Sequence, residues 1–220
     1  MVDVQSGTFG ISDGVTLSGN ANTSTEVNGG AVNVASGAAF YLLGGTVTGN
    51  TAAQGGAVNV ASGAAFYLLG GTVTGNTAAQ GGAVNSASGA NVYLQGGTVT
   101  GNTAALGGGI YSEGAVNVKG TVSVTENKDQ NDAASNLVLA GEGKINVIGA
   151  TTGSTIGVQV KDAKAGVSVV GLAEGVTDVT LAEVLPQLTY EGQTFTIGED
   201  GKLVDSTVTV TPTPSEKPEA

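Results

Sequence analysis

The 220-residue sequence contains no cysteine, histidine, tryptophan or arginine. Without cysteine it forms no disulfide, which fits the cytosol and equally a bacterial surface that functions without them. Without histidine or arginine, two of the usual groups that abstract a proton are missing. Residues 27–112 carry no charged side chain, which argues strongly against a catalytic site on that stretch. We therefore expect no enzyme activity, no metal and no cofactor.

Positive charge is also scarce. The sequence has 7 lysines against 18 acidic residues, so its net charge is −11. This charge argues against nucleic-acid partners and against docking on anionic membranes. No apolar run is long enough to span a bilayer, so we expect no membrane insertion. The first residues, MVDVQSG, lack the regions of a signal peptide, and we interpret Met1 as a point inside a longer protein.

Glycine is abundant instead, with 38 residues, and it marks a 26-residue repeat. Residues 29–54 read GGAVNVASGAAFYLLGGTVTGNTAAQ, and residues 55–80 repeat them letter for letter. Residues 81–106 are a close copy, residues 107–127 a shortened one, and residues 1–28 a degenerate first unit. A fixed period of about 20–50 residues is typical of a repeat architecture.

Each unit divides at glycines into three short runs, AVNV, AAFYLL and TVT, whose length and composition favour strands. No helical period is present, and the glycine pairs would destabilise a helix. We predict an all-β fold: a parallel β-helix, or β-solenoid, with three strands and three corners per rung. Each strand then pairs with its own copy about 4.8 Å away. The general rule for parallel crossovers makes the coil right-handed.

Differences between the copies predict which side chains face outward. Val92 replaces Phe40 and Phe66 and stays apolar, whereas Gln95 replaces Leu43 and Leu69 and is assigned to the outside. The tyrosine two residues before Gln95 shares its direction, because side chains alternate along a strand. The predicted core set is Phe40, Phe66, Val92, Leu42, Leu68 and Leu94, and the predicted outward set is Tyr41, Tyr67, Tyr93, Leu43, Leu69 and Gln95.

The TVT strand predicts a second outward ladder. Its valines, Val47, Val73 and Val99, are assigned to the core, and the threonines on either side of them point out. The outward threonines are Thr46, Thr48, Thr72, Thr74, Thr98 and Thr100, extended to five rungs by Thr16 with Ser18 and by Thr121 with Ser123.

Two sets of asparagines recur with the same period. Asn33, Asn59 and Asn85 alternate with valines and are predicted to face outward. Asn50, Asn76 and Asn102 follow the TVT strand, where asparagine suits a turn. Stacked copies of that turn can also bond to one another along the axis, as asparagine ladders do.

Beyond Asn127 the strict period is lost. We predict a polar loop at 128–135. Strands in irregular rungs are then predicted at 136–140, 144–148, 156–160 and 167–170. Thr180 and Glu183 resemble a capping box for a short helix that ends at Pro186, with a loop as the equal alternative. Residues 188–204 predict a hairpin with turns at 191–192 and 200–201.

The chain therefore divides into three predicted parts. Residues 1–148 form the parallel β-helix, residues 149–205 form irregular rungs and a C-terminal cap, and residues 206–220 form a Thr/Pro-rich linker or tail.

The GGAV and GGGI openings and the VTGNTA endings resemble two known sets of repeats. One set belongs to the chlamydial polymorphic outer-membrane autotransporters, which carry an FxxN motif. The asparagine of that motif corresponds to Asn50, Asn76 and Asn102, and its phenylalanine position is occupied here by Val47, Val73 and Val99. The other belongs to large surface proteins of gut Gram-positive bacteria. The resemblance implies a right-handed parallel β-helix on a secreted or cell-wall-attached adhesin or stalk. The given residues contain neither an LPxTG-like motif nor the strands of an autotransporter barrel, so the resemblance leaves the mode of attachment open.

Four functional hypotheses remain open. The tyrosine column, with Leu43, Leu69 and Gln95 beside it, would contact a glycan or a host surface protein, or it would merely stiffen the coil of a stalk. Pectate lyases and polygalacturonases share the fold class, but the regular rungs lack the clustered carboxylates that their chemistry needs. In the acidic C-terminal part, the segment 199–202 is interpreted as a turn in preference to a calcium-binding loop. The threonine ladder resembles the flat face of ice-binding solenoids.

Overall fold

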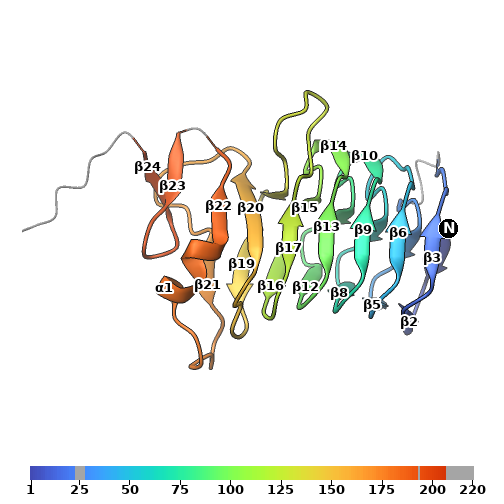
Figure 1. Ribbon diagram of the computed structural model, residues 1–220, viewed down its shortest axis with the longest axis horizontal. Helices are drawn as coiled ribbons and strands as arrows, with labels where there is room; N and C mark the ends of the chain where they lie inside the picture. Colours follow the sequence, from blue (N-terminus) through green and yellow to red (C-terminus); the bar gives the residue numbers. More distant parts are fainter. Residues whose placement is uncertain (23–27, 193, 207–220) are drawn as a thin grey trace, which may run out of the picture.

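The structure is a computed structural model that describes residues 1–22, 28–192 and 194–206. The chain is all-β and forms a parallel β-solenoid of about six turns, with about 26 residues per turn, followed by a small β-rich C-terminal region. Figure 1 shows the rungs stacked side by side from the N-terminal end in blue to the C-terminal region in red. The predicted all-β solenoid and its period are confirmed.

Three walls of parallel strands surround the core, and the strands of each wall share one run of the repeat. The first wall contains β1 (Val2–Val4), β4 (Val32–Val34), β7 (Val58–Val60), β11 (Val84–Ser86), β15 (Ile110–Ser112) and β18 (Leu137–Leu139). The second contains β2 (Thr8–Ile11), β5 (Ala39–Leu42), β8 (Ala65–Leu68), β12 (Asn91–Leu94), β16 (Ala115–Val118), β19 (Lys144–Val147) and β21 (Val170–Leu172). The third contains β3 (Thr16–Ser18), β6 (Thr46–Thr48), β9 (Thr72–Thr74), β13 (Thr98–Thr100) and β17 (Ser123–Thr125).

The strands pair in register with their own copies, as predicted. Phe40 lies opposite Phe66, and Thr46 lies opposite Thr72. Beyond the repeats, the six-residue strand β20 (Thr155–Val160) pairs with β17 through its first half and with β18 through its second half. The first and third walls thereby join into one 13-stranded sheet, so the regular three-walled coil ends at this strand.

The core runs along the middle of the coil. All of the predicted core side chains of the repeats are buried, so that set is confirmed. The rings of Phe9, Phe40 and Phe66 stack in line, with centroid distances of 5.6 Å and 5.5 Å. Because burial of one such side chain contributes about 1.5–3 kcal/mol, each added rung brings its own share of core stabilisation.

The predicted asparagine ladder is present, and it is fully buried. The backbone N and Nδ2 of Asn50 both donate to Oδ1 of Asn76, at 3.0 and 2.9 Å. Asn76 donates in the same way to Asn102. Each Nδ2 also donates to carbonyl oxygens, which for Asn76 are those of Val47 and Thr74. The ladder therefore ties each corner to the rungs before and after it.

The ladder extends beyond the repeats in both directions. Asn20 donates to Asn50, and Asn102 donates to Asn127, which donates to Asn136. Asn136 ends the series by donating from its backbone N and its Nδ2 to the carboxylate of Glu191. Glu191, from the C-terminal region, thus terminates a hydrogen-bonded column that spans the coil.

The second asparagine set alternates with the core valines, but it is less exposed than predicted. Asn59 and Asn85 are only 7% and 6% exposed, and Asn59 Nδ2 donates to Asn33 Oδ1 at 3.0 Å. The next residue in register is Tyr111, which packs with Val138, Ala140 and Leu106 in a separate hydrophobic cluster. Side chains on this side of the first wall are therefore covered, which the alternation pattern does not show.

The covering comes in part from a fourth strand that was predicted as a corner. The TAAQ and TAAL segments form β10 (Thr77–Gln80) and β14 (Thr103–Leu106), which pair in parallel. The prediction of three strands per rung is therefore incomplete for these two copies. The stretch is rich in alanine, which is depleted in strands, and pairing with its own copy outweighs that weak preference.

The threonine ladder continues at a different place from the one predicted. Thr98 and Thr100 lie opposite Ser123 and Thr125, not opposite Thr121 and Ser123. The prediction was wrong by two residues because the fourth copy is shortened before this strand. Thr125 stands two residues before Asn127, as Thr100 stands two residues before Asn102, and this spacing marks the correct register.

Two predictions in the C-terminal region are confirmed and two are corrected. The helix α1 (Leu181–Val184) has the Thr180–Glu183 capping box, and a 3-10 turn (Leu185–Gln187) continues it through Pro186. The antiparallel hairpin of β23 (Phe195–Ile197) and β24 (Leu203–Asp205) turns at the predicted 200–201. However, β22 (Leu188–Tyr190) pairs in parallel with β20, outside any hairpin, and β21 begins only at Val170.

The described part of the chain contains no helix that is long and apolar enough to cross a membrane. Residues 23–27 of the predicted first unit, and residues 207–220 of the predicted linker or tail, lie outside the described residues.

Candidate functional site

The three repeat tyrosines form one column on the outer side of the second wall. Tyr41, Tyr67 and Tyr93 stand in register on β5, β8 and β12, and each is half-buried. Adjacent ring centroids are 4.4 Å apart, and the ring planes differ by only 1° and 2°. The structure therefore brings the predicted tyrosines together, as a parallel stack along the axis of the coil.

This stacking decides which parts of the rings face a partner. Both faces of the Tyr67 ring are covered, one by Tyr41 and the other by Tyr93. The outward surface consequently offers ring edges and hydroxyl groups, while ring faces are available only at the ends of the stack. At the far end the column continues with Asn117, which donates to Asn91 and accepts from Asn146.

The other predicted outward residues lie beside the tyrosines. Leu43 is 54% exposed, while Leu69 and Gln95 are half-buried. The tyrosine column and this second column form one apolar surface, which we call the tyrosine stripe: Tyr41, Tyr67, Tyr93, Leu43, Leu69 and Gln95. A contiguous apolar strip on the outer side of a folded domain is a usual sign of a contact surface.

The stack also changes the acidity of its central member. Burial raises the pKa of Tyr67 to about 12, and the neighbouring Tyr93 and Tyr41 add to the shift through charge repulsion and hydrogen bonding. Because the raised pKa favours the neutral phenol in the folded state, its contribution to stability is complete below pH 10 and is lost as the pH rises to 12.

We therefore expect one tyrosine of the folded chain to ionise about two pH units after an ordinary tyrosine. A spectrophotometric titration of the tyrosinate absorbance measures this directly. In Tyr67→Phe the ring stack is retained, and the late step near pH 12 should disappear. Ionisation of all tyrosines in a single step near pH 10 would contradict the stacked arrangement.

The threonine ladder forms a regular grid on the third wall. The six predicted threonines of β6, β9 and β13 pair strictly in register and are half-buried. At the following rung Ser123 Oγ and Thr125 Oγ1 lie 3.2 Å apart, and Thr100 Oγ1 donates to Glu126 Oε2 at 3.4 Å. Part of this face is therefore engaged in hydrogen bonds within the chain.

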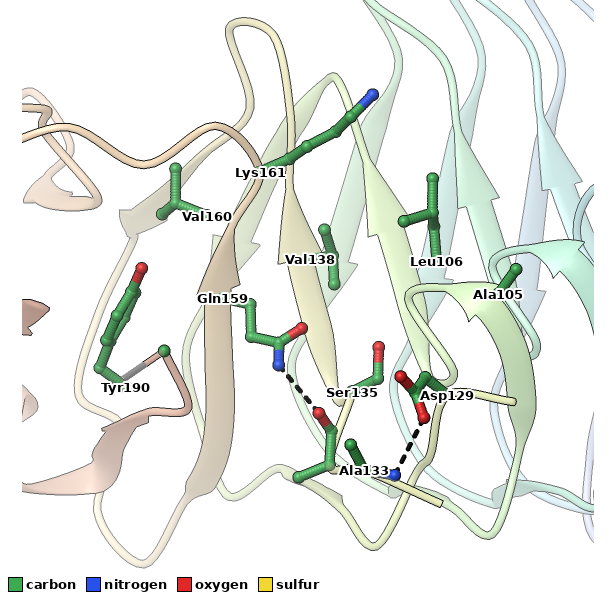
Figure 2. A pocket seen from close by; sticks show the side chains of 12 residues that line it. Ala105, Leu106, Asp129, Ala133, Ser135, Val138, Gln159, Val160, Lys161 and Tyr190 are labelled. Atoms are coloured by element: carbon green, nitrogen blue, oxygen red, sulfur yellow. Dashed lines mark hydrogen bonds between the residues drawn. The ribbon is translucent and has the colours of Figure 1, made fainter. Parts of the chain in front are cut away.

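A cavity of about 290 Å³ opens beside the irregular rungs. Its apolar side chains come from Leu106, Val138 and Val160, and Tyr190 stands at one end, as Figure 2 shows. Lys161 extends from the rim. Sequence reasoning missed this cavity because its lining comes from segments that are far apart in the sequence and outside the repeats.

The loop 128–135 forms one side of this cavity and has a defined structure of its own. Asp129 accepts hydrogen bonds from the backbone N of Ala133 and Asn131, at 2.9 and 2.7 Å, and these bonds lower the pKa of its carboxyl group. Gln159 Nε2 donates across the cavity to the carbonyl oxygen of Ala134, at 2.8 Å. This hydrogen bond links the strand β20 to the loop and helps to hold the loop in place.

Comparison with protein-family models, curated proteins and solved structures finds no match. The relation to the surface-protein repeats rests on the sequence motifs alone. Within the described residues, no three Asp, Glu, His or Cys side chains gather where they could hold a metal ion together. The tyrosine stripe and the cavity are therefore assessed from their own geometry.

Proposed function

We propose that this chain is a non-catalytic part of a bacterial surface protein that binds a glycan through the tyrosine stripe. The observation that supports this most is the rigid parallel stack of Tyr41, Tyr67 and Tyr93, with the 54%-exposed Leu43 beside it. The stack fixes the rings before binding, so little side-chain freedom is lost when a partner contacts them. Tyrosine offers an apolar ring together with a hydroxyl group, which suits a partner that is itself amphipathic.

The charge distribution agrees with this proposal. Residues 27–112 contain no charged side chain, so the residues of the stripe itself present no ion that a neutral glycan would have to desolvate. Repeated rungs also display the same groups at a fixed spacing, as a repeating polymer would require. The same regularity would serve a stalk without a ligand, and the experiment below separates the two roles.

The test is binding of the purified chain to a broad glycan array and to mucin. A variant with Tyr41, Tyr67 and Tyr93 all changed to serine is expected to bind at least about tenfold more weakly, since truncated aromatic anchors often contribute more than 1 kcal/mol each. The matched control changes the same residues to phenylalanine and keeps the ring stack. Circular dichroism establishes that each variant retains the coil.

Absence of binding by the parent chain would overturn the adhesin proposal and support the stalk. Equal binding by the parent and the serine variant would move the contact surface away from the tyrosine stripe.

A further inference from the structure

The position that precedes Tyr41 in the tyrosine column is occupied by a glycine. Gly10 of β2 lies in register with Tyr41, in the place that Tyr41 itself occupies relative to Tyr67. The face of the Tyr41 ring that points away from Tyr67 is therefore directed over a glycine. A methyl group added to Gly10 would lie 3.5 Å from Tyr41 O and 3.8 Å from Leu43 Cδ1. A side chain can therefore begin at Gly10 without a steric clash.

The two ends of the stack differ. At the far end, Tyr93 is followed by Asn117, whose side chain is held by hydrogen bonds to Asn91 and Asn146. At the near end, Gly10 presents only backbone. Tyr67 has no free face, so the ring face of Tyr41 over Gly10 is the place in the described stack where a flat ring can be added at the stacking distance of 4.4 Å.

The first rung carries exposed polar residues on both sides of Gly10. Thr8 lies in register with Ala39, and it is exposed, as is Ser12 on the other side of Gly10. The exposed carboxylate of Asp13 lies against Gly44, at the next corner. Exposed hydroxyl and carboxylate groups on the same rung as an open aromatic face suit a pyranose, which has an apolar C–H face and a rim of hydroxyl groups.

Charge selects among such rings. Asp13 and the net charge of −11 disfavour an acidic sugar. We infer that a neutral hexopyranose of a bound glycan stacks on the free face of Tyr41 over Gly10, as the next ring of the column. This inference rests on the proposed glycan-binding function and assigns it a place and a sugar class.

The decisive variant is Gly10→Tyr, which puts a protein ring where the sugar would stack. The backbone of Gly10 lies outside the left-handed region that would disfavour a side chain, and the outward edges of Tyr41, Tyr67 and Tyr93 stay unchanged. The matched control is Gly171→Tyr, at the other end of the same sheet column, where nothing lies within 4 Å of an added side chain. The probes are neutral β-glucoside and β-galactoside disaccharides.

We expect Gly10→Tyr to weaken binding of these probes at least tenfold, while Gly171→Tyr binds as the parent does. Parent-like binding by Gly10→Tyr would overturn the inference. If binding were lost only in the variant with all three tyrosines changed to serine, the proposed glycan binding by the tyrosine stripe would stand and the place over Gly10 would be wrong. If the parent binds only acidic glycans, the sugar class is wrong while glycan binding itself stands.

Discussion

Changing Asn76 to alanine should lower the free energy of unfolding by about 4 kcal/mol, because several buried groups lose their partners together. The backbone N of Asn50 would lose its acceptor, Oδ1 of Asn76, and the carbonyl oxygens of Val47 and Thr74 would lose a donor. Asn76 is completely buried, so water cannot replace these bonds. Chemical denaturation followed by circular dichroism measures the change.

The matched control is Asn59→Ala in the same rung. Asn59 also belongs to a ladder, but its bonds run only between side chains, to Asn33 and from Asn85. The Asn59→Ala substitution should lower the free energy of unfolding by about 1 kcal/mol. Equal effects of the two substitutions would show that the backbone bonds of the Asn76 ladder carry no special weight.

Changing Gly82 to alanine should be at least as damaging, with a loss of more than about 4 kcal/mol or failure to fold. A methyl group at this position would collide with the carbonyl oxygen of Gly108 and would lie 2.7 and 2.8 Å from O and N of Thr103. All of these are backbone atoms of the stretch 103–108, which lies nearly one full turn further along the chain and stacks directly on Gly82. Because backbone cannot rotate away as a side chain can, the two rungs would have to separate.

Gly10→Ala is the control for this substitution, since its added methyl group meets neighbours only at 3.5 Å or more. It should change the stability by less than about 1 kcal/mol. Thermal unfolding of both variants tests the difference. A Gly82→Ala chain as stable as the parent would mean that the glycine pair is retained for its turn alone, without a role in rung spacing.

The repeats made most of the coil predictable. Three copies with small differences act as substitution experiments: Val92 for Phe40 identifies the core, and Gln95 for Leu43 identifies the surface. In-register parallel pairing then follows, because identical strands bury identical faces. The prediction failed where the period changed, as at Thr121, whose place in the grid is taken by Ser123.

Long-range pairing limited the prediction of the C-terminal region. The Glu191–Gly192 pair resembles a hairpin turn, but Leu188–Tyr190 instead joins β20 in parallel, and Glu191 reaches the buried Asn136. Nothing in the local sequence indicates either contact, because each depends on where the last rung ends. The local signals that succeeded, the capping box at Thr180 and the Asp200–Gly201 turn, are those that act within a few residues.

For the candidate site, sequence alternation predicted the direction of the tyrosines but not the orientation of their rings. A period of two places Tyr41, Tyr67 and Tyr93 on one face, and only the three-dimensional stack shows that the ring faces cover one another. The importance of Gly10 follows from that stack. The cavity near Tyr190 had no sequence signal beyond the loop that interrupts the repeat at 128–135.

The asparagine column also has an electrical direction. Each amide in it accepts at its oxygen from the asparagine before it and donates an N–H to the oxygen of the asparagine after it, so the small dipoles along the column add as those of an α-helix backbone do. The positive end of this side-chain dipole meets the carboxylate of Glu191. An extra rung would lengthen the dipole without changing its sign at either end, and the same anionic cap would still fit.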